Sequence, residues 1–336
     1  MLKIDTIKLK APIDTLRDFN PEQMDFDTKK RGDKLVKSQY LKTNIGVGFK
    51  TATIDTLDNS VLIEISAKIL AENYYSLINQ NTIEQAIDTI NTTGVVNLDR
   101  NQFIDTAQIM RCDITQNLHP SQKIENYFTA LSMLPITDKY NVAIYKNGGV
   151  KNNGIVISGK QKTFKERQIF YNKLTDVWRD KELKRVIDQN TLLNQFKGVL
   201  RVETNFTQHR KIKEYCGGSN NLIDVLKAQT NPNYQIFKKI TKQTPDTGLT
   251  LFEKYEGMKL YEVEKIEGRK QIIKNLNNDI GLIKEFLGRF SKGNLSRTIA
   301  EYRQLINELV PNEIKEQSMI DEIIYLMSNE PTLKVA

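Results

Sequence analysis

Two short segments of the sequence place an arginine and a carboxylate on one face of a predicted β-strand. They are MRCDIT at 110–115 and LRVETN at 200–205. Side chains alternate along a strand, so Arg111 and Asp113 share a face in the first segment. Arg201 and Glu203 share a face in the second segment for the same reason. A repeated charged face needs an explanation, because one arginine–carboxylate pair across a sheet contributes only about 0.2–1 kcal/mol.

The acidic residues on these predicted strands admit two interpretations. One is a solvated sheet face on which arginine and acid pair. The other is a set of carboxylates that holds a hard divalent cation, formed by Asp113 and Glu203, with Glu64 of VLIEIS as a third ligand and Asp5 as a further candidate. The chain has only two histidines and two cysteines, with no zinc-binding spacing. Carboxylates with few histidines favour Mg²⁺ or Mn²⁺ over zinc.

The segment KERQIFYNKL at 165–174 supplies a possible nucleophile. Tyr171 is flanked there by the basic residues Lys165, Arg167 and Lys173. A phenol has a pKa of about 10 and attacks poorly unless a metal or nearby cations favour the phenolate. Beside a metal-bound phosphodiester, such a tyrosine could carry out phosphotyrosyl transfer. The alternative is a packing residue, since the chain has 13 tyrosines.

Composition and charge narrow the class of protein. A chain of 336 residues with 39% hydrophobic residues is globular and of a length that suggests about two domains. The net charge of +8 favours an anionic partner such as nucleic acid. No apolar run approaches the roughly 18 residues of a membrane span. The two cysteines, Cys112 and Cys216, show no disulfide framework and fit a reducing, cytoplasmic compartment.

Hydrophobic periodicity predicts an α+β domain over 1–225 and a mainly helical domain over 226–336. On the strand at 3–10, alternation places Asp5, Ile7 and Leu9 on one face. The other predicted elements are a strand at 44–54, a strand within 60–70 that runs into a helix, strands at 108–118 and 198–206, a hairpin over 140–160, and helices at 81–94, 121–134, 295–313 and 313–327. Ser121 and Ser296 are the expected helix N-caps, and Pro311 is the expected stop of the 295–313 helix.

The order of these segments resembles a known family. The series KIDTIKLK, VLIEISAKIL, MRCDIT, RQIFYNK and GVLRVETNF is similar to the replication initiators of filamentous phages, the gene II/X family. More distantly it resembles the rolling-circle initiators of small plasmids. The resemblance implies an antiparallel-sheet domain like that of the HUH-type endonucleases. The His-hydrophobic-His signature of the classical members is absent here.

The resemblance also implies a function. It would be metal-dependent, site-specific nicking and rejoining of origin DNA, as a single strand or extruded hairpin, through a 5′-phosphotyrosyl intermediate. Tyr171 and Lys173 would be catalytic, and Mg²⁺ or Mn²⁺ would be held by Asp113, Glu203 and Glu64. The expected DNA-binding residues are Arg111, Arg201, Arg167 and Lys165. A host polymerase would extend the 3′-hydroxyl. The sequence contains no P-loop, so a host helicase would unwind the DNA. The C-terminal domain would bind DNA or a partner.

Two other functions stay open on the sequence. A non-catalytic phage or plasmid DNA-binding regulator would use the same positive charge without chemistry at Tyr171. A metal-dependent nucleotidyl transferase, such as a primase, would use the carboxylates without a tyrosine nucleophile. The covalent protein–DNA adduct distinguishes the proposed enzyme from both.

Overall fold

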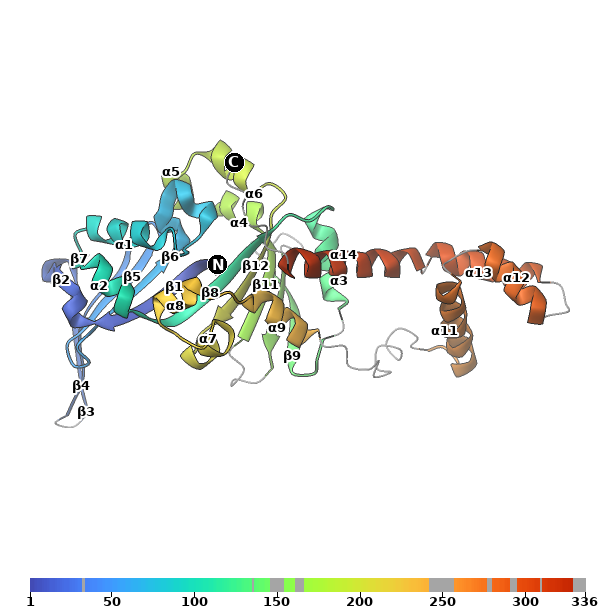
Figure 1. Ribbon diagram of the computed structural model, residues 1–336, viewed down its shortest axis with the longest axis horizontal. Coiled ribbons are helices and arrows are strands. Elements are labelled where there is room, and N and C mark those ends of the chain that lie inside the picture. Colours follow the sequence, from blue (N-terminus) through green and yellow to red (C-terminus); the bar gives the residue numbers. More distant parts are fainter. Residues whose placement is uncertain are drawn as a thin grey trace. The chain divides into compact units, whose positions relative to one another are not determined.

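The chain divides into two compact units, Met1–Lys242 together with Ile323–Ala336, and Gln243–Glu322. The computed structural model describes residues 1–31, 34–134, 136–145, 154–160, 166–241, 257–276, 280–290, 295–308 and 310–328 (Figure 1). The first unit extends beyond the predicted boundary at 225 and includes a segment near the C-terminus. The sequence predicts one domain followed by the other, whereas the first unit consists of two segments of the chain with the second unit between them in sequence.

The first unit is built on a ten-stranded sheet with the order β3-β4-β5-β6-β1-β8-β12-β11-β10-β9. Every neighbouring pair is antiparallel. The strands are β1 (Ile4–Pro12), β3 (Asp25–Arg31), β4 (Lys34–Gly46), β5 (Phe49–Asp55), β6 (Ser60–Ser66), β8 (Gln108–Leu118), β9 (Tyr140–Tyr145), β10 (Gly154–Gly159), β11 (Glu166–Asn172) and β12 (Leu200–Phe206). A small second sheet pairs β2 (Leu16–Phe19) with β7 (Val96–Leu98). An α+β fold with a large antiparallel sheet is confirmed.

The two faces of the central strands differ in chemistry. Ile7 of β1 lies opposite Cys112 of β8 and Ile65 of β6, and all three side chains are buried. The neighbouring residues of the same strands point the other way, so Thr6, Asp113 and their neighbours form the second, polar face. The alternation predicted from the sequence therefore holds along β8 and β12.

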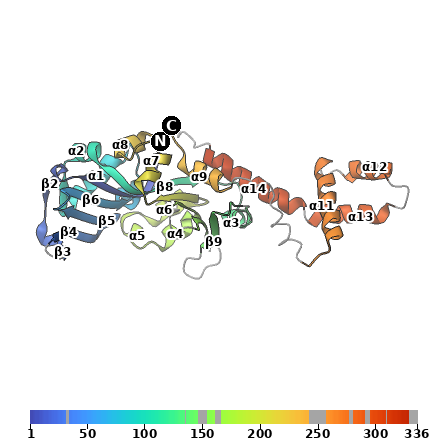
Figure 2. The ribbon, with the colours of Figure 1, turned by 90° about the horizontal axis from the view of Figure 1, so that it is seen from below.

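Helices cover both faces. In Figure 2, α7 (His209–Tyr215), α8 (Leu222–Lys227) and α9 (Pro232–Ile240) lie on one side of the sheet. On the other side are α4 (Lys173–Arg179), α5 (Leu183–Val186) and α6 (Gln189–Phe196). The 3-10 segment η3 (Ala67–Ser76) follows β6 and packs on β1. The remaining helical elements of this unit are η1 (Ile13–Thr15), η2 (Pro21–Gln23), α1 (Ile83–Thr92), α2 (Arg100–Thr106) and α3 (Ile124–Ser132).

Helix α9 explains why the first unit extends beyond residue 225. Its residues Ile236, Phe237 and Ile240 are buried, and it packs against β8, β11 and β12. The end of α14 (Val310–Ser328) also belongs to this unit, where Ile323 and Met327 are buried. The amides of Gln116 and Asn231 donate hydrogen bonds to the Met327 carbonyl. The last carbonyls of a helix lack intrahelical donors, so these amides stabilise its end.

The described elements of the second unit are helical. They are α11 (Leu260–Asn275), α12 (Ile280–Phe290), α13 (Ser296–Glu308) and the first part of α14. Ile273, Ile283 and Tyr302 form its buried centre. Across the described ranges of both units, no helix is both long and apolar enough to cross a membrane.

Three predicted helix ends were wrong. The helix expected at 121–134 begins at Ile124, with Lys123 and not Ser121 at the N-cap. Ser296 is the first residue of α13 and not its cap. Pro311 lies in the first turn of α14 and does not end the preceding helix. A proline is tolerated there because the first amides of a helix have no intrahelical acceptor.

Candidate active site

A cavity of about 390 Å³ opens on the polar face of the central strands. Its lining combines both signs of charge with two tyrosines. The lining residues are Asp5, Thr6, Lys50, Ser66, Lys68, Tyr74, Arg111, Asp113, Arg167, Ile169, Tyr171, Lys173, Asp176, Asp180, Glu203 and Asn205. The structure therefore brings Tyr171, Lys173, Asp113 and Glu203 together, as the sequence predicts.

A β-bulge brings Asp5 into this cavity. Ile4 of β1 pairs with Ile114 of β8 and Thr6 pairs with Asp113, so Asp5 is an extra residue without a partner of its own. A bulge re-aims a side chain and is frequent beside active sites. The prediction that Asp5 shares a face with Ile7 and Leu9 was wrong for this reason.

A second irregularity brings Lys50 to the same cavity. Phe49 of β5 pairs with Ile65 of β6, and Thr51 pairs with Glu64, so Lys50 is the extra residue on β5. Its ammonium donates a hydrogen bond to the Thr6 hydroxyl at 3.2 Å. Sequence alternation assumes an unbroken register and could not identify Lys50 as a residue of the cavity.

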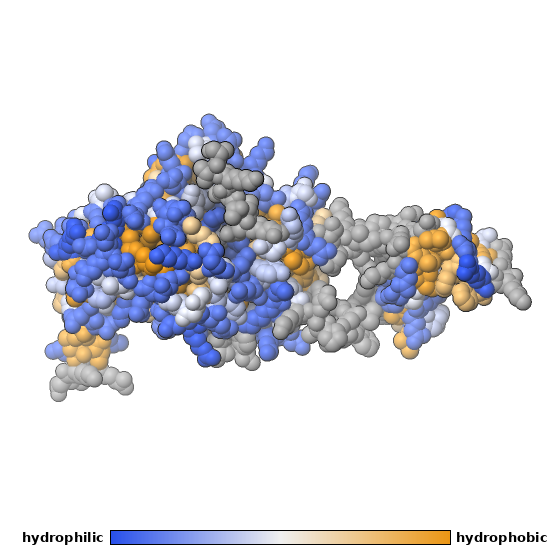
Figure 3. Space-filling view, in the orientation of Figure 1, coloured by the Kyte–Doolittle hydropathy of each residue, from blue (hydrophilic) through white to orange (hydrophobic). Residues whose placement is uncertain are grey.

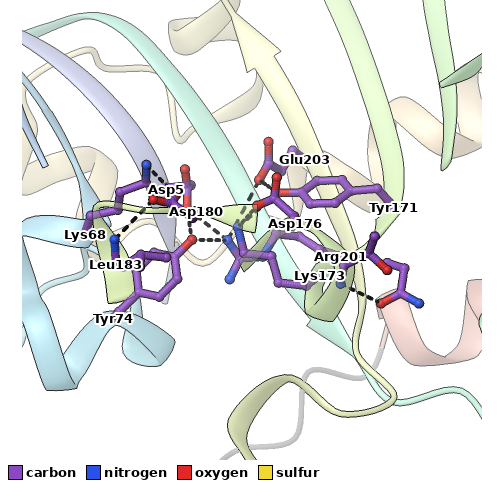
Figure 4. Close-up of polar contacts among 12 residues, drawn as sticks. Asp5, Lys68, Tyr74, Tyr171, Lys173, Asp176, Asp180, Leu183, Arg201 and Glu203 are labelled. Carbon is purple, nitrogen blue, oxygen red and sulfur yellow. Dashed lines mark hydrogen bonds and ion pairs between the residues drawn. The ribbon is translucent and has the colours of Figure 1, made fainter. Parts of the chain in front are cut away.

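Arg201 lies beneath the cavity, and none of its side chain is exposed. Its Nη1 donates to Asp5 at 2.9 Å and to the Tyr74 hydroxyl at 3.3 Å, while its Nε donates to Asn117 at 2.9 Å. The same Nη1 lies 3.9 Å from Glu203 Oε1. Arg201 therefore fixes Asp5 and Glu203 from below (Figure 4). The prediction that Arg201 contacts DNA was wrong, because a fully buried guanidinium cannot reach a phosphate.

Tyr171 and Glu203 point toward each other in the cavity (Figure 4). The Tyr171 hydroxyl donates a hydrogen bond of 2.5 Å to Glu203 Oε1. Lys173 Nζ donates to the Tyr171 oxygen at 3.4 Å and pairs with Asp176 at 2.7 Å. Only 3% of the Lys173 side chain is exposed, so it is a buried cation of the site.

Burial determines the protonation of this pair. Burial and the neighbouring Glu203 carboxylate raise the pKa of Tyr171 well above its usual value. The phenol is therefore held protonated, contrary to the expectation that its basic flanks favour a phenolate. Burial and the nearby Asp5 charge raise the pKa of Glu203 to about 7, even though Arg201 and Lys173 oppose the shift. A carboxylate with this pKa that accepts the phenol proton has the properties of a general base.

Gly154 of β10 leaves the space that Tyr171 needs. It lies directly opposite Tyr171 in the register of β10 and β11. A Cβ on Gly154 would lie 2.3 Å from the Phe170 carbonyl oxygen and 2.8 Å from the Tyr171 Cβ. Any larger residue would displace the strand that carries Tyr171, so Gly154 is a positioning residue.

The predicted metal ligands divide between the cavity and its surroundings. Asp113 and Glu203 line the cavity, whereas Glu64 is not among the lining residues and lies 3.7 Å from Arg111. In the part of the chain that the structure describes, no three His, Cys, Asp or Glu side chains converge closely enough to hold a metal ion. The predicted set of three ligands therefore does not fit as a group.

Asp113 by itself has the features of a cation ligand. It is 7% exposed, and its buried Oδ1 has no hydrogen-bond partner. Burial raises its pKa, and Asp5 adds to the rise, although Arg111 and Asn205 oppose it. Mg²⁺ is commonly held by one or two carboxylates together with water and substrate phosphates. The unpaired Oδ1 of Asp113 is therefore compatible with a cation site that has fewer than three protein ligands.

The remaining predicted DNA contacts lie at the rim or outside the described chain. Arg167 is exposed and Arg111 has a half-exposed side chain, and both line the cavity. Lys165 falls outside the described residues. Sequence reasoning missed Asp180, which pairs with Lys68 at 2.6 Å and helps to form one wall.

Comparisons with known proteins give little beyond this geometry. No protein-family model and no curated protein sequence matches the chain. One solved structure that it is similar to is the rolling circle replication initiator protein from Geobacillus stearothermophilus. The identity is 13%, the match covers 61% of this chain and 74% of that chain, and the TM-score is 0.26. This similarity is too low to assign a function, so the function is inferred from the residues of the site.

We predict that Arg201→Met lowers the free energy of unfolding by about 3–5 kcal/mol, because it leaves the Asp5 carboxylate buried without its partner. Urea denaturation at pH 7 measures the change. Arg111→Met is the control, because a half-exposed arginine paired with carboxylates contributes about 0–1 kcal/mol. Equal losses in the two variants would contradict the assignment of Arg201 as the buried centre of the site.

Proposed function

We propose that this protein is a replication initiator that nicks and rejoins single strands of origin DNA through Tyr171. The observation that carries the proposal is the hydrogen bond from the Tyr171 hydroxyl to Glu203, inside a cavity with a cationic rim. A buried phenol paired with a carboxylate of raised pKa is the arrangement of an activated nucleophile. The order of motifs that resembles the filamentous-phage initiators supports the same reaction.

The chemical step follows from the positions of these groups. As the Tyr171 oxygen attacks phosphorus, its proton passes to Glu203 Oε1. The bond from phosphorus to the 3′-oxygen breaks, and this oxygen leaves with the electron pair and takes a proton from solvent. The product is a 5′-phosphotyrosyl protein and a free 3′-hydroxyl. The new phosphodiester conserves the energy of the old one, so the reverse reaction needs no nucleoside triphosphate.

Several cations would bind the phosphate during this step. Lys50, Arg111 and Arg167 come from three different strands and line the cavity. Lys173 lies beside the attacking oxygen and would offset negative charge that develops there. Positively charged groups that are already in position cost little reorganisation when the transition state forms.

Asp113 would hold the divalent cation, together with phosphate oxygens of the DNA. Bound there, Mg²⁺ or Mn²⁺ would polarise the scissile phosphate. In this proposal Glu203 acts as the base, and Glu64 orients Arg111. A host polymerase would extend the 3′-hydroxyl, and a separate helicase would unwind the duplex.

We predict that Tyr171→Phe abolishes nicking of a single-stranded origin oligonucleotide and the covalent protein–DNA adduct. The ring remains but the attacking oxygen is lost. Denaturing gel electrophoresis with labelled DNA and Mn²⁺ measures both products. Tyr75→Phe is the control, since its hydroxyl bonds to His119 outside the cavity lining. Binding without nicking by the unaltered protein would favour the regulator, and nucleotide-dependent synthesis without an adduct would favour the primase.

The pKa of Glu203 predicts the pH dependence of nicking. A general base must be deprotonated, so the rate should rise with pH, reach half its maximum near pH 7 and level off above it. Glu203→Gln should remove this acid limb and lower the rate by about 10²–10⁴-fold. Single-turnover rates between pH 5 and 9 measure both effects. An unchanged profile in Glu203→Gln would assign the proton transfer to another group.

The cation site is tested by binding rather than by activity. We predict that Asp113→Asn weakens Mn²⁺ binding by at least about tenfold, because even the loss of a group that only hydrogen-bonds to a metal ligand has an effect of this size. Electron paramagnetic resonance of free Mn²⁺ measures the affinity with an uncleavable single strand present. Glu64→Gln is the control and should bind Mn²⁺ like the unaltered protein. Equal affinities in all three proteins would contradict the role of Asp113.

A further inference from the structure

The hairpin of β3 and β4 forms a surface that the cavity does not use. β3 is an edge strand of the sheet, paired on one side with β4. Thr28, Lys29 and Lys30 of β3 and Leu35 and Val36 of β4 are all exposed. The two strands form a ribbon at the lower left of the ribbon diagram (Figure 1). These exposed side chains are accessible to a partner.

The ribbon concentrates the positive charge of the chain. The ten residues from 28 to 37, TKKRGDKLVK, contain five basic residues and one acidic residue, a net charge of +4. The whole chain has a net charge of +8. Half of the net charge therefore falls on one short segment, which points to a polyanionic partner.

The cross-strand pairs of the ribbon neutralise only part of this charge. Lys37 of β4 forms an ion pair with Asp27 of β3. Lys29 and Lys30 of β3 are exposed, so an anion can reach both of these lysines.

Protection against aggregation does not explain the surface. Lysines on an edge strand commonly prevent pairing with other chains. Here, however, large apolar side chains accompany them, with Phe26 57%, Val36 44% and Leu35 36% exposed. Figure 3 shows apolar side chains gathered over β3 and β4 beside polar ones. Exposed apolar residues on an edge would promote the aggregation that lysines prevent, so the mixture indicates a binding surface.

We infer that the β3–β4 ribbon binds double-stranded DNA next to the nicking site. A two-stranded ribbon fits the major groove, where lysines reach phosphates and apolar side chains meet sugars and thymine methyl groups. β3 lies seven strands from β11, the strand that carries Tyr171, which is roughly 34 Å at about 4.8 Å per strand. Along a DNA strand, this is roughly ten nucleotides at about 3.4 Å each. The inference rests on the proposed function for the place of this duplex beside the cleaved strand.

The salt dependence of duplex binding tests this inference. Lys29→Ala with Lys30→Ala should weaken binding of duplex oligonucleotides of any sequence and reduce the slope of log affinity against log salt by about two. Fluorescence anisotropy of the full chain measures the slope. The matched control is Lys197→Ala with Lys227→Ala, a pair of exposed lysines on other elements, which should leave the slope unchanged. Equal effects of the two pairs would overturn the inference.

A second measurement separates this inference from the nicking activity. Tyr171→Phe should keep the duplex affinity of the unaltered protein, even if nicking proves not to occur. The ribbon variant should keep its melting temperature, which shows that it is folded. Unchanged duplex binding in the ribbon variant, with loss of self-association in sedimentation, would instead assign the ribbon to a second copy of the chain and overturn the inference.

Discussion

The buried guanidinium of Arg201 is the interaction on which the candidate site depends. It binds Asp5, Asn117 and the Tyr74 hydroxyl and lies next to Glu203. A charge without solvent contact is costly unless it is paired and hydrogen-bonded. The arrangement therefore holds two carboxylates of different strands in fixed positions. It also keeps Asp5 ionised, since Lys173 and Arg201 lower the pKa of Asp5 although burial raises it.

The ionised Asp5 has a consequence for its neighbour. Its negative charge, added to burial, raises the pKa of Glu203 to about 7. The two carboxylates thus differ in affinity for a proton, and such separation assigns the roles of charged partner and base in many active sites. Glu203 can take the proton that Tyr171 must lose before its oxygen attacks. The buried arginine, the charged aspartate and the reactive tyrosine are therefore parts of one electrostatic system.

Much of this arrangement could be predicted from the sequence, and the rest could not for physical reasons. The period of two along β8 and β12 placed Asp113 and Glu203 on one face, because these two strands pair with each other without a register shift. The same rule failed for Asp5, because Asp5 is an extra residue in β1 and its side chain lies on the opposite face of the sheet from the predicted one. The sequence does not show which charged side chains are buried. Arg201 was therefore predicted to contact DNA, and Tyr171 was predicted to be a phenolate. The β3–β4 ribbon was not predicted, because the sequence DFDTKKR of β3 lacks the apolar alternation that marks a half-buried strand.

Tyr171 is the residue that we propose to form the covalent bond to DNA. Trypsin cleaves after Arg167 and Lys173, so the peptide QIFYNK, residues 168–173, carries Tyr171 as its single tyrosine. Mass spectrometry of the trypsin- and nuclease-treated adduct measures which peptide carries the nucleotide. We expect the nucleotide on this peptide, attached to Tyr171. A nucleotide on the peptide that contains Tyr74, or nicked DNA without any modified peptide, would show that Tyr171 is not the nucleophile.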